Sequence, residues 1–217
     1  DAAVSRGIAP LQEKLVGKAA DQAPLYGIGT FEDLFPRTAY AVLMHLALQI
    51  RDGCERHMAE AEYEGAHRCA VRTCLALALD RIANYLTSLC VWRSSRTCVL
   101  PTFSRQALAM TWDFGEMNPF AGTAGDWEES VDYVANVIER LAKCDAYATV
   151  VRGSAQDMPF ETGSIDAVIT DPPYYDNVIY SDLADFFYVW LKRTIGDLYP
   201  NHFAAELSPK RAEACLL

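Results

Sequence analysis

Residues 170 to 187 read TDPPYYDNVIYSDLADFF, in which an aspartate stands directly before two prolines and a tyrosine. Asp171 follows the apolar run IDAVIT, so its carboxylate is expected at the end of a strand, where α/β sheets bind ligands. Pro172 restricts the residue before it to extended geometry, and two successive prolines fix φ and offer carbonyl oxygens without amide hydrogens. The pattern predicts a stiff loop of acceptors. The plainer interpretation is a turn with Tyr174 packed in the core.

Such a loop suits a planar amino group, whose two hydrogens can go to the Asp171 carboxylate and to the carbonyl oxygen of Pro172. The exocyclic amine of adenine or cytosine is a poor nucleophile because its lone pair is delocalised into the ring. Donating a hydrogen bond to each of these two acceptors favours the reactive pyramidal form of that amine. The Tyr174 ring can cover the base, since stacking of about 1–3 kcal/mol per base is comparable with the few kcal/mol that extrusion from a duplex costs.

The motif resembles the signature of amino-methyltransferases that use S-adenosylmethionine. The longer strings GSAQDMPFETGSIDAVITDPPYYDNVIYSDLADFFYVWLKR and TWDFGEMNPFAGTAGDWEESVDYVANVIERL look like the central part of the large prokaryotic adenine-specific DNA methylases, some of which carry a zinc ribbon. The resemblance runs from about residue 31 to residue 210. It implies that Asp171, Pro172, Pro173 and Tyr174 bind the target base, with Tyr175, Asp176 and Asn177 extending the loop.

The implied reaction is transfer of a methyl group from S-adenosylmethionine to adenine N6 of DNA, by direct in-line displacement. An aspartate at the head of the motif favours adenine over cytosine within that family. Two alternatives stay open: an RNA methyltransferase acting on guanine N2, whose enzymes share D-P-P-Y or D-P-P-F, and a catalytically incomplete interaction module. The sequence does not give a recognition sequence, a restriction partner or an oligomeric state.

The resemblance also implies residues for the cofactor. Related enzymes place an acid after the strand that precedes the motif, to accept from the cofactor adenine; here Ser154 occupies that position and Asp157 follows three residues later. Asp157 is either that acceptor or a solvated loop acid. A glycine-rich turn should approach the methionine part of the cofactor. The segment NPFAGTAG, residues 118 to 125, follows no buried strand and reads as an ordinary loop, so we expect the true turn upstream of Asp1.

The elements that position the motif are predicted from apolar patterning. The β-branched runs at residues 147 to 152 and 165 to 170 are typical of strands buried on both faces. With the aromatic helix at 181 to 195 they predict an α/β fold, a partial Rossmann-like methyltransferase sheet that is parallel. Phe186, Phe187, Tyr188 and Trp190 are expected mainly in the core, although a stacking role for them is the alternative.

Upstream of this unit the chain is predicted to be helical. Apolar residues at helical spacing indicate helices over about 35 to 64 and 66 to 90, packed as a hairpin. Residues 91 to 125 read as loops with one short element. A helix over 127 to 144 should begin at the N-cap Asp126. We therefore divide the chain into a helical and irregular region, 1–125, and part of the catalytic domain, 126–217.

Composition bounds the interpretation. The 217 residues are 51% hydrophobic and 22% charged, which is ordinary for a folded chain. No apolar stretch is long enough for a membrane span and no signal peptide is visible, so a cytoplasmic location is expected. The net charge of −10 opposes a general nucleic-acid surface, and any basic surface must be local. Arg37, Arg105 or the pair Lys192 and Arg193 could meet phosphates, or merely solvate helices.

Cysteine spacing gives no metal site. The seven cysteines are odd in number and contain no C-x-x-C pair, so reduced thiols, mostly buried, are expected and no zinc site is predicted. The four histidines pair with no cysteine or serine in a recognisable nucleophile arrangement.

Overall fold

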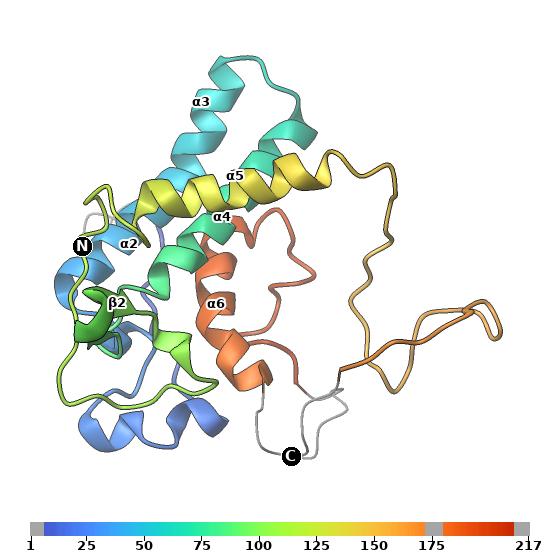
Figure 1. The fold of residues 1–217 in the computed structure, drawn as a ribbon. Helices are drawn as coiled ribbons and strands as arrows, with labels where there is room; N and C mark the ends of the chain where they lie inside the picture. The colour runs from blue at the N-terminus through green and yellow to red at the C-terminus, as the bar shows by residue number, and fades with distance from the viewer. Residues whose placement is uncertain (1–6, 172–179, 211–217) are drawn as a thin grey trace.

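The computed structural model describes residues 7–171 and 180–210, and its core is a set of packed helices (Figure 1). Helix α4 (Gly65–Ala83) lies against both α5 (Trp127–Leu141) and α6 (Tyr180–Ile195). The N-terminal segment packs on α6 and α2 (Arg37–Leu48) through three 3₁₀ helices: η1 (Gly17–Ala20), η2 (Ala23–Tyr26) and η3 (Glu32–Leu34). The predicted helical region is therefore present.

The first predicted helix, 35 to 64, is confirmed as a nearly continuous helix in three parts. Helix α2 runs into a π-helical turn, η4 (Gln49–Gly53), and then into α3 (Cys54–Glu60). Pro36 is the N-cap residue of α2, where its missing amide hydrogen is no loss. Buried residues repeat along α2 at helical spacing, as the apolar pattern predicted.

The second predicted helix, 66 to 90, is confirmed as α4 but ends early, at Ala83. The carbonyl oxygen of Asn84 accepts hydrogen bonds from the amide (2.8 Å) and hydroxyl (2.9 Å) of Thr102, and the Asn84 side chain accepts from the Phe103 amide at 3.0 Å. Leu86 still lies in the core. Tertiary hydrogen bonds to the next segment thus end the helix although the apolar pattern continues.

Residues 91 to 125 are mostly loop, as predicted, and hold the only sheet of the described chain. Strand β1 (Val91–Arg93) pairs antiparallel with β2 (Cys98–Leu100), so that Trp92 faces Val99 and Arg93 faces Cys98. A 3₁₀ turn, η5 (Ser94–Arg96), connects the strands. A further 3₁₀ turn, η6 (Thr102–Ser104), follows β2.

Helix α5 begins where the sequence predicts. Asp126 is the N-cap, and its carboxylate accepts from the Glu129 amide at 2.9 Å and from the Thr123 amide at 3.1 Å. The segment NPFAGTAG before it is a loop, in which Gly122 and Gly125 adopt positive φ. The loop therefore forms the cap of α5, and the structure gives it no strand that would make it a cofactor turn.

The predicted strands at 147 to 152 and 165 to 170 are wrong. Between α5 and Asp171 the backbone contains turns and one isolated bridge, Ser154 with Asp157, and Figure 1 shows this stretch extending away from the helices. Apolar side chains of both runs are exposed, Ile169 to 95%. A strand needs a hydrogen-bonded neighbour, and β-propensity expresses packing on such a neighbour more than a preference of the backbone. No described segment lies beside either run as a partner strand.

Helix α6 confirms the predicted aromatic helix and its core role. Phe186 and Trp190 are fully buried and contact Phe35, with ring centroids 5.8 Å and 5.5 Å apart, respectively. Phe187 is half-buried against Phe103, and Tyr188 donates to the Ala205 carbonyl oxygen at 2.9 Å. The described fold is thus mixed: helices with a small antiparallel sheet. The Rossmann-like parallel sheet and the division at residue 125 stay predictions.

Replacing the N-cap residue of α5 tests how much this cap stabilises the protein. Asp126→Ala leaves the amide groups of Thr123 and Glu129 without their acceptor and should lower the free energy of unfolding by about 1–2 kcal/mol. Urea denaturation followed by circular dichroism measures the change. The exposed Asp132 of the same helix is the control, and a loss of equal size in Asp132→Ala would contradict the capping role.

Candidate functional site

Asp171 lies at the end of the exposed segment and is itself exposed. No hydrogen bond or ion pair within residues 7–171 and 180–210 engages its carboxylate, which therefore stays accessible to a ligand. The other predicted base-binding residues, Pro172, Pro173 and Tyr174, lie outside the described residues, as do Tyr175, Asp176 and Asn177. The predicted roles of these residues stay predictions.

The predicted cofactor residues lie together in one tight turn. The Asp157 amide donates to the Ser154 carbonyl oxygen at 3.2 Å, and the Gln156 amide donates to the Ser154 hydroxyl at 3.2 Å. Ser154 also lines a concavity of about 400 Å³ whose apolar wall includes Met158 and Phe160, whereas Asp157 does not line it. The structure joins Ser154 to Asp157, but no described contact joins either residue to Asp171.

The helix that follows the motif is anchored by two buried acids that the sequence analysis did not single out. The Asp182 carboxylate accepts from the Lys18 amide at 2.9 Å, and it approaches Gly17 so closely that a Cβ there would lie 2.0 Å from the oxygen. Asp185 is fully buried and accepts from both the amide (2.9 Å) and the hydroxyl (2.5 Å) of Ser208. These bonds hold both the N-terminal segment and residues near 208 against the first turns of α6.

A lysine completes this anchor. The Lys210 ammonium group contacts the Asp185 carboxylate directly and lies 3.6 Å from Asp182 Oδ1. One cation thereby balances two buried acids, which alone would be costly to keep ionised inside the protein. The signal for this anchor in the sequence is the pair of acids three residues apart on the buried face of an otherwise apolar helix.

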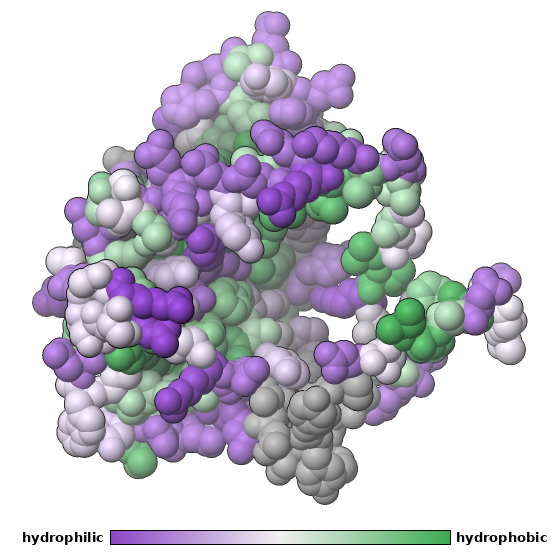
Figure 2. Space-filling view, in the orientation of Figure 1, coloured by the Kyte–Doolittle hydropathy of each residue, from purple (hydrophilic) through white to green (hydrophobic). Residues whose placement is uncertain are grey.

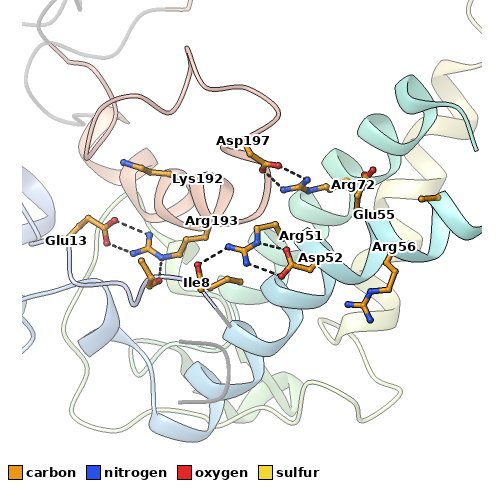
Figure 3. A pocket seen from close by; sticks show the side chains of 13 residues that line it. Ile8, Glu13, Arg51, Asp52, Glu55, Arg56, Arg72, Lys192, Arg193 and Asp197 are labelled. Carbon is orange, nitrogen blue, oxygen red and sulfur yellow. Dashed lines mark hydrogen bonds and ion pairs between the residues drawn. The ribbon is translucent and has the colours of Figure 1, made fainter. Parts of the chain in front are cut away.

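A cavity larger than the concavity at Ser154 lies elsewhere among the described residues and is lined by paired charges. Its volume is about 820 Å³, and Figure 3 shows Arg51, Arg72 and Arg193 each facing an acid: Asp52, Asp197 and Glu13, respectively.

Arg193 is the most completely engaged of these cations. It forms two hydrogen bonds to the Glu13 carboxylate, at 2.9 and 3.0 Å, and its remaining donors go to the carbonyl oxygens of Ala9, Pro10 and Val189. A guanidinium group has five N–H donors, and here every one has an acceptor. The expectation that Arg193 meets a phosphate or solvates its helix is therefore wrong. It fastens the N-terminal segment to α6.

Helix α4 contains a buried acid with an altered pKa. Asp80 is 6% exposed, its Oδ1 atom has no hydrogen-bond partner, and no ion pair between described residues includes it. Burial raises the pKa of its carboxyl group well above the ordinary value. Such groups often mark functional sites, but Asp80 does not line the cavities around Arg193 or Ser154, so we assign it to the core.

Metal binding and membrane insertion find no support in the described part of the chain. Within residues 7–171 and 180–210, no three His, Cys, Asp or Glu side chains gather as metal ligands. None of the helices there has both the length and the apolarity that crossing a membrane requires. The prediction that the cysteines are mostly buried is wrong for the six that the structure describes: Cys90 is buried, Cys144 is exposed and the other four are partly exposed, and none of the six forms a disulfide.

Comparison of the chain with models of known protein families, with curated proteins and with solved structures gives no match in any of the three. The functional argument therefore depends on the residues themselves.

The close contact between Gly17 and Asp182 predicts the effect of a methyl group. Gly17→Ala should destabilise the protein by about 2 kcal/mol or more, because φ is +56° there and the added carbon would displace the carboxylate. Gly27→Ala is the matched control, since φ is also positive (+86°) and nothing lies within 4 Å of the added carbon. Equal loss of stability in the two variants, measured by urea unfolding, would show that the carboxylate contact is unimportant.

The raised pKa of Asp80 predicts how stability depends on pH. Above the unfolded-state pKa of about 3.9 the unfolded chain releases this proton while the folded chain keeps it. The contribution of Asp80 is therefore complete below that pKa and is lost as pH rises towards the folded-state value. Asp80→Asn should gain stability relative to wild type between pH 4 and pH 7, measured by urea unfolding, and the exposed-site control Asp145→Asn should not. A difference from wild type that does not change with pH would contradict the burial argument.

Proposed function

We propose that this chain carries part of a DNA amino-methyltransferase that uses S-adenosylmethionine and methylates the N6 amine of an extruded adenine. The observation that supports this most is the contrast at residues 171 to 185. Asp171 is exposed and unpaired among the described residues, whereas the helix after the motif is fixed by buried anchors at Asp182 and Asp185. A free acceptor next to a rigid support is what a base-binding loop requires.

In this proposal Asp171 accepts one hydrogen bond from the target amine and the Pro172 carbonyl oxygen accepts the other. Both bonds strengthen as the nitrogen becomes pyramidal and positively charged, so they act mainly in the transition state. The amine nitrogen would take the methyl carbon as the bond from that carbon to the sulfonium sulfur breaks, S-adenosylhomocysteine would be the leaving group, and the amine proton would pass to Asp171 or to water. Tyr174 stacks on the base.

The turn around Ser154 fits part of the cofactor. Its concavity of about 400 Å³ falls within the range of small-molecule sites, and an apolar wall with two hydroxyl-bearing residues, Thr149 and Ser154, suits a planar ring such as adenine. Ser154 would hold that ring, whereas Asp157 lies outside the concavity. S-Adenosylmethionine, when bound, supplies an electrophilic methyl group. The proposed substrate is DNA, and the proposed location of the protein is the cytoplasm.

Replacement of the exposed acid tests the proposal. Asp171→Asn should lower kcat about 10²- to 10³-fold, the usual cost of removing one preorganised hydrogen-bonding group from a transition state, with little change in KM. Transfer of a labelled methyl group to DNA, measured next to RNA, gives the rates. Asp166→Asn, an exposed acid of the same segment, is the control and should retain wild-type kcat.

Other outcomes would replace the proposal. Label found in RNA guanine rather than DNA adenine would favour the guanine-N2 alternative. If calorimetry shows no binding of S-adenosylmethionine and no label is transferred, the chain is better described as an interaction module.

A further inference from the structure

The charge of the chain is unevenly distributed. Although the net charge is −10, the stretch from Arg81 to Trp112 contains no aspartate or glutamate and four arginines, the others being Arg93, Arg96 and Arg105. This stretch includes the whole β1–β2 hairpin. The hairpin is therefore a local basic region on an acidic protein.

The arginines of the hairpin are unpaired. Arg93 and Arg96 flank the turn between the strands and are exposed, and no hydrogen bond or ion pair between the described residues engages either side chain. Arg72 and Arg193 of the helical core, in contrast, each contact an acid. Unpaired guanidinium groups three residues apart at a hairpin turn are well suited to contact successive phosphates.

Exposed tryptophans accompany these cations. Trp92 on β1 is 53% exposed, and Trp112 is 98% exposed with only an edge contact to Tyr26, at 6.4 Å between ring centroids. The segment after Trp112 lies beside β1, because the Gly115 amide donates to the Cys90 carbonyl oxygen at 2.8 Å and a Cβ on Gly115 would lie 3.6 Å from the Trp92 nitrogen. The backbones that carry the two rings, β1 and the loop after Trp112, are thus neighbouring segments.

The position of this surface is visible in the figures. The hairpin lies at the side of the molecule opposite the extended segment that leads to Asp171 (Figure 1). In the space-filling view the same place is covered by strongly hydrophilic and intermediate residues, with little apolar surface (Figure 2). Rings among cations, without a broad apolar patch, favour a polyanion with stackable rings over an apolar protein partner.

We infer that Trp92, Arg93, Arg96 and Trp112, the hairpin patch, bind an unpaired stretch of the DNA substrate. This inference rests on the proposed function and adds where the polynucleotide is held. The two arginines contact phosphates, and the tryptophans stack on bases, which a single strand offers and an intact duplex does not. A local cationic surface of this kind reconciles DNA binding with the net negative charge of the chain.

The test measures binding to a fluorescently labelled single-stranded oligodeoxynucleotide by anisotropy, without cofactor, between 50 and 200 mM salt. The double variant Arg93→Gln/Arg96→Gln should bind more weakly, and the slope of log K against log salt should fall by about 1.4, the value for two phosphate contacts to a single strand. Trp112→Ala should weaken binding about tenfold, and Trp112→Phe should restore most of it.

The matched control is Arg140→Gln/Lys143→Gln. These two exposed cations are also three residues apart, and their removal changes the net charge equally. The control should keep wild-type affinity and salt slope. An equal loss in both double variants, no loss in the hairpin variant, or no binding of DNA by wild type would overturn the inference.

Failure of the proposed function would look different. If the hairpin variant loses DNA binding while wild type transfers no methyl group, the hairpin patch stands and the methyltransferase proposal does not. If wild type methylates DNA and the hairpin variant binds and methylates as well as wild type, the inference fails alone.

Discussion

The burial of two carboxylates beside one lysine determines what helix α6 contacts. Ionised Asp182 and Asp185 would be strongly disfavoured in the core without partners that donate hydrogen bonds or carry positive charge. The Lys18 amide, Ser208 and Lys210 are these partners, so all three must be in place. Satisfying these acids brings both the N-terminal segment and the residues near 208 onto one helix. Helix α6 is consequently held from two sides.

Aromatic packing provides the other half of this arrangement. Phe186 and Trp190 fill the core against Phe35, so the same helix that anchors the acids also supplies the largest buried rings. The exposed Asp171 and the buried Asp182 are eleven positions apart in the chain. That arrangement explains why the segment up to Asp171 can remain exposed while α6 is fixed.

The helices were predictable because their signals are local. The spacing of apolar residues in α2, the N-cap at Asp126 and the aromatic run of α6 all express short-range rules, and the structure follows them. The strands predicted at 147 to 152 and 165 to 170 were wrong, because a β-branched run becomes a strand only beside a partner. The end of α4 at Ala83 and the burial of Arg193 depend on contacts with distant residues that no local pattern reveals. For the candidate site, the sequence singled out Asp171, Ser154 and Asp157, whose roles stay predictions, but missed the anchors of α6.

The attachment of the N-terminal segment to α6 also constrains the order of folding. Two partners of residues 9 to 18, Asp182 and Arg193, lie more than 160 positions later in the chain. During synthesis, residues 9 to 18 leave the ribosome long before Asp182 and Arg193 are made, and contacts of such high sequence separation form slowly. Leu11 and Leu15 are buried in the folded protein, and they cannot pack against α6 until α6 has been synthesised. Residues 9 to 18 thus acquire part of their final contacts only after α6 has been synthesised.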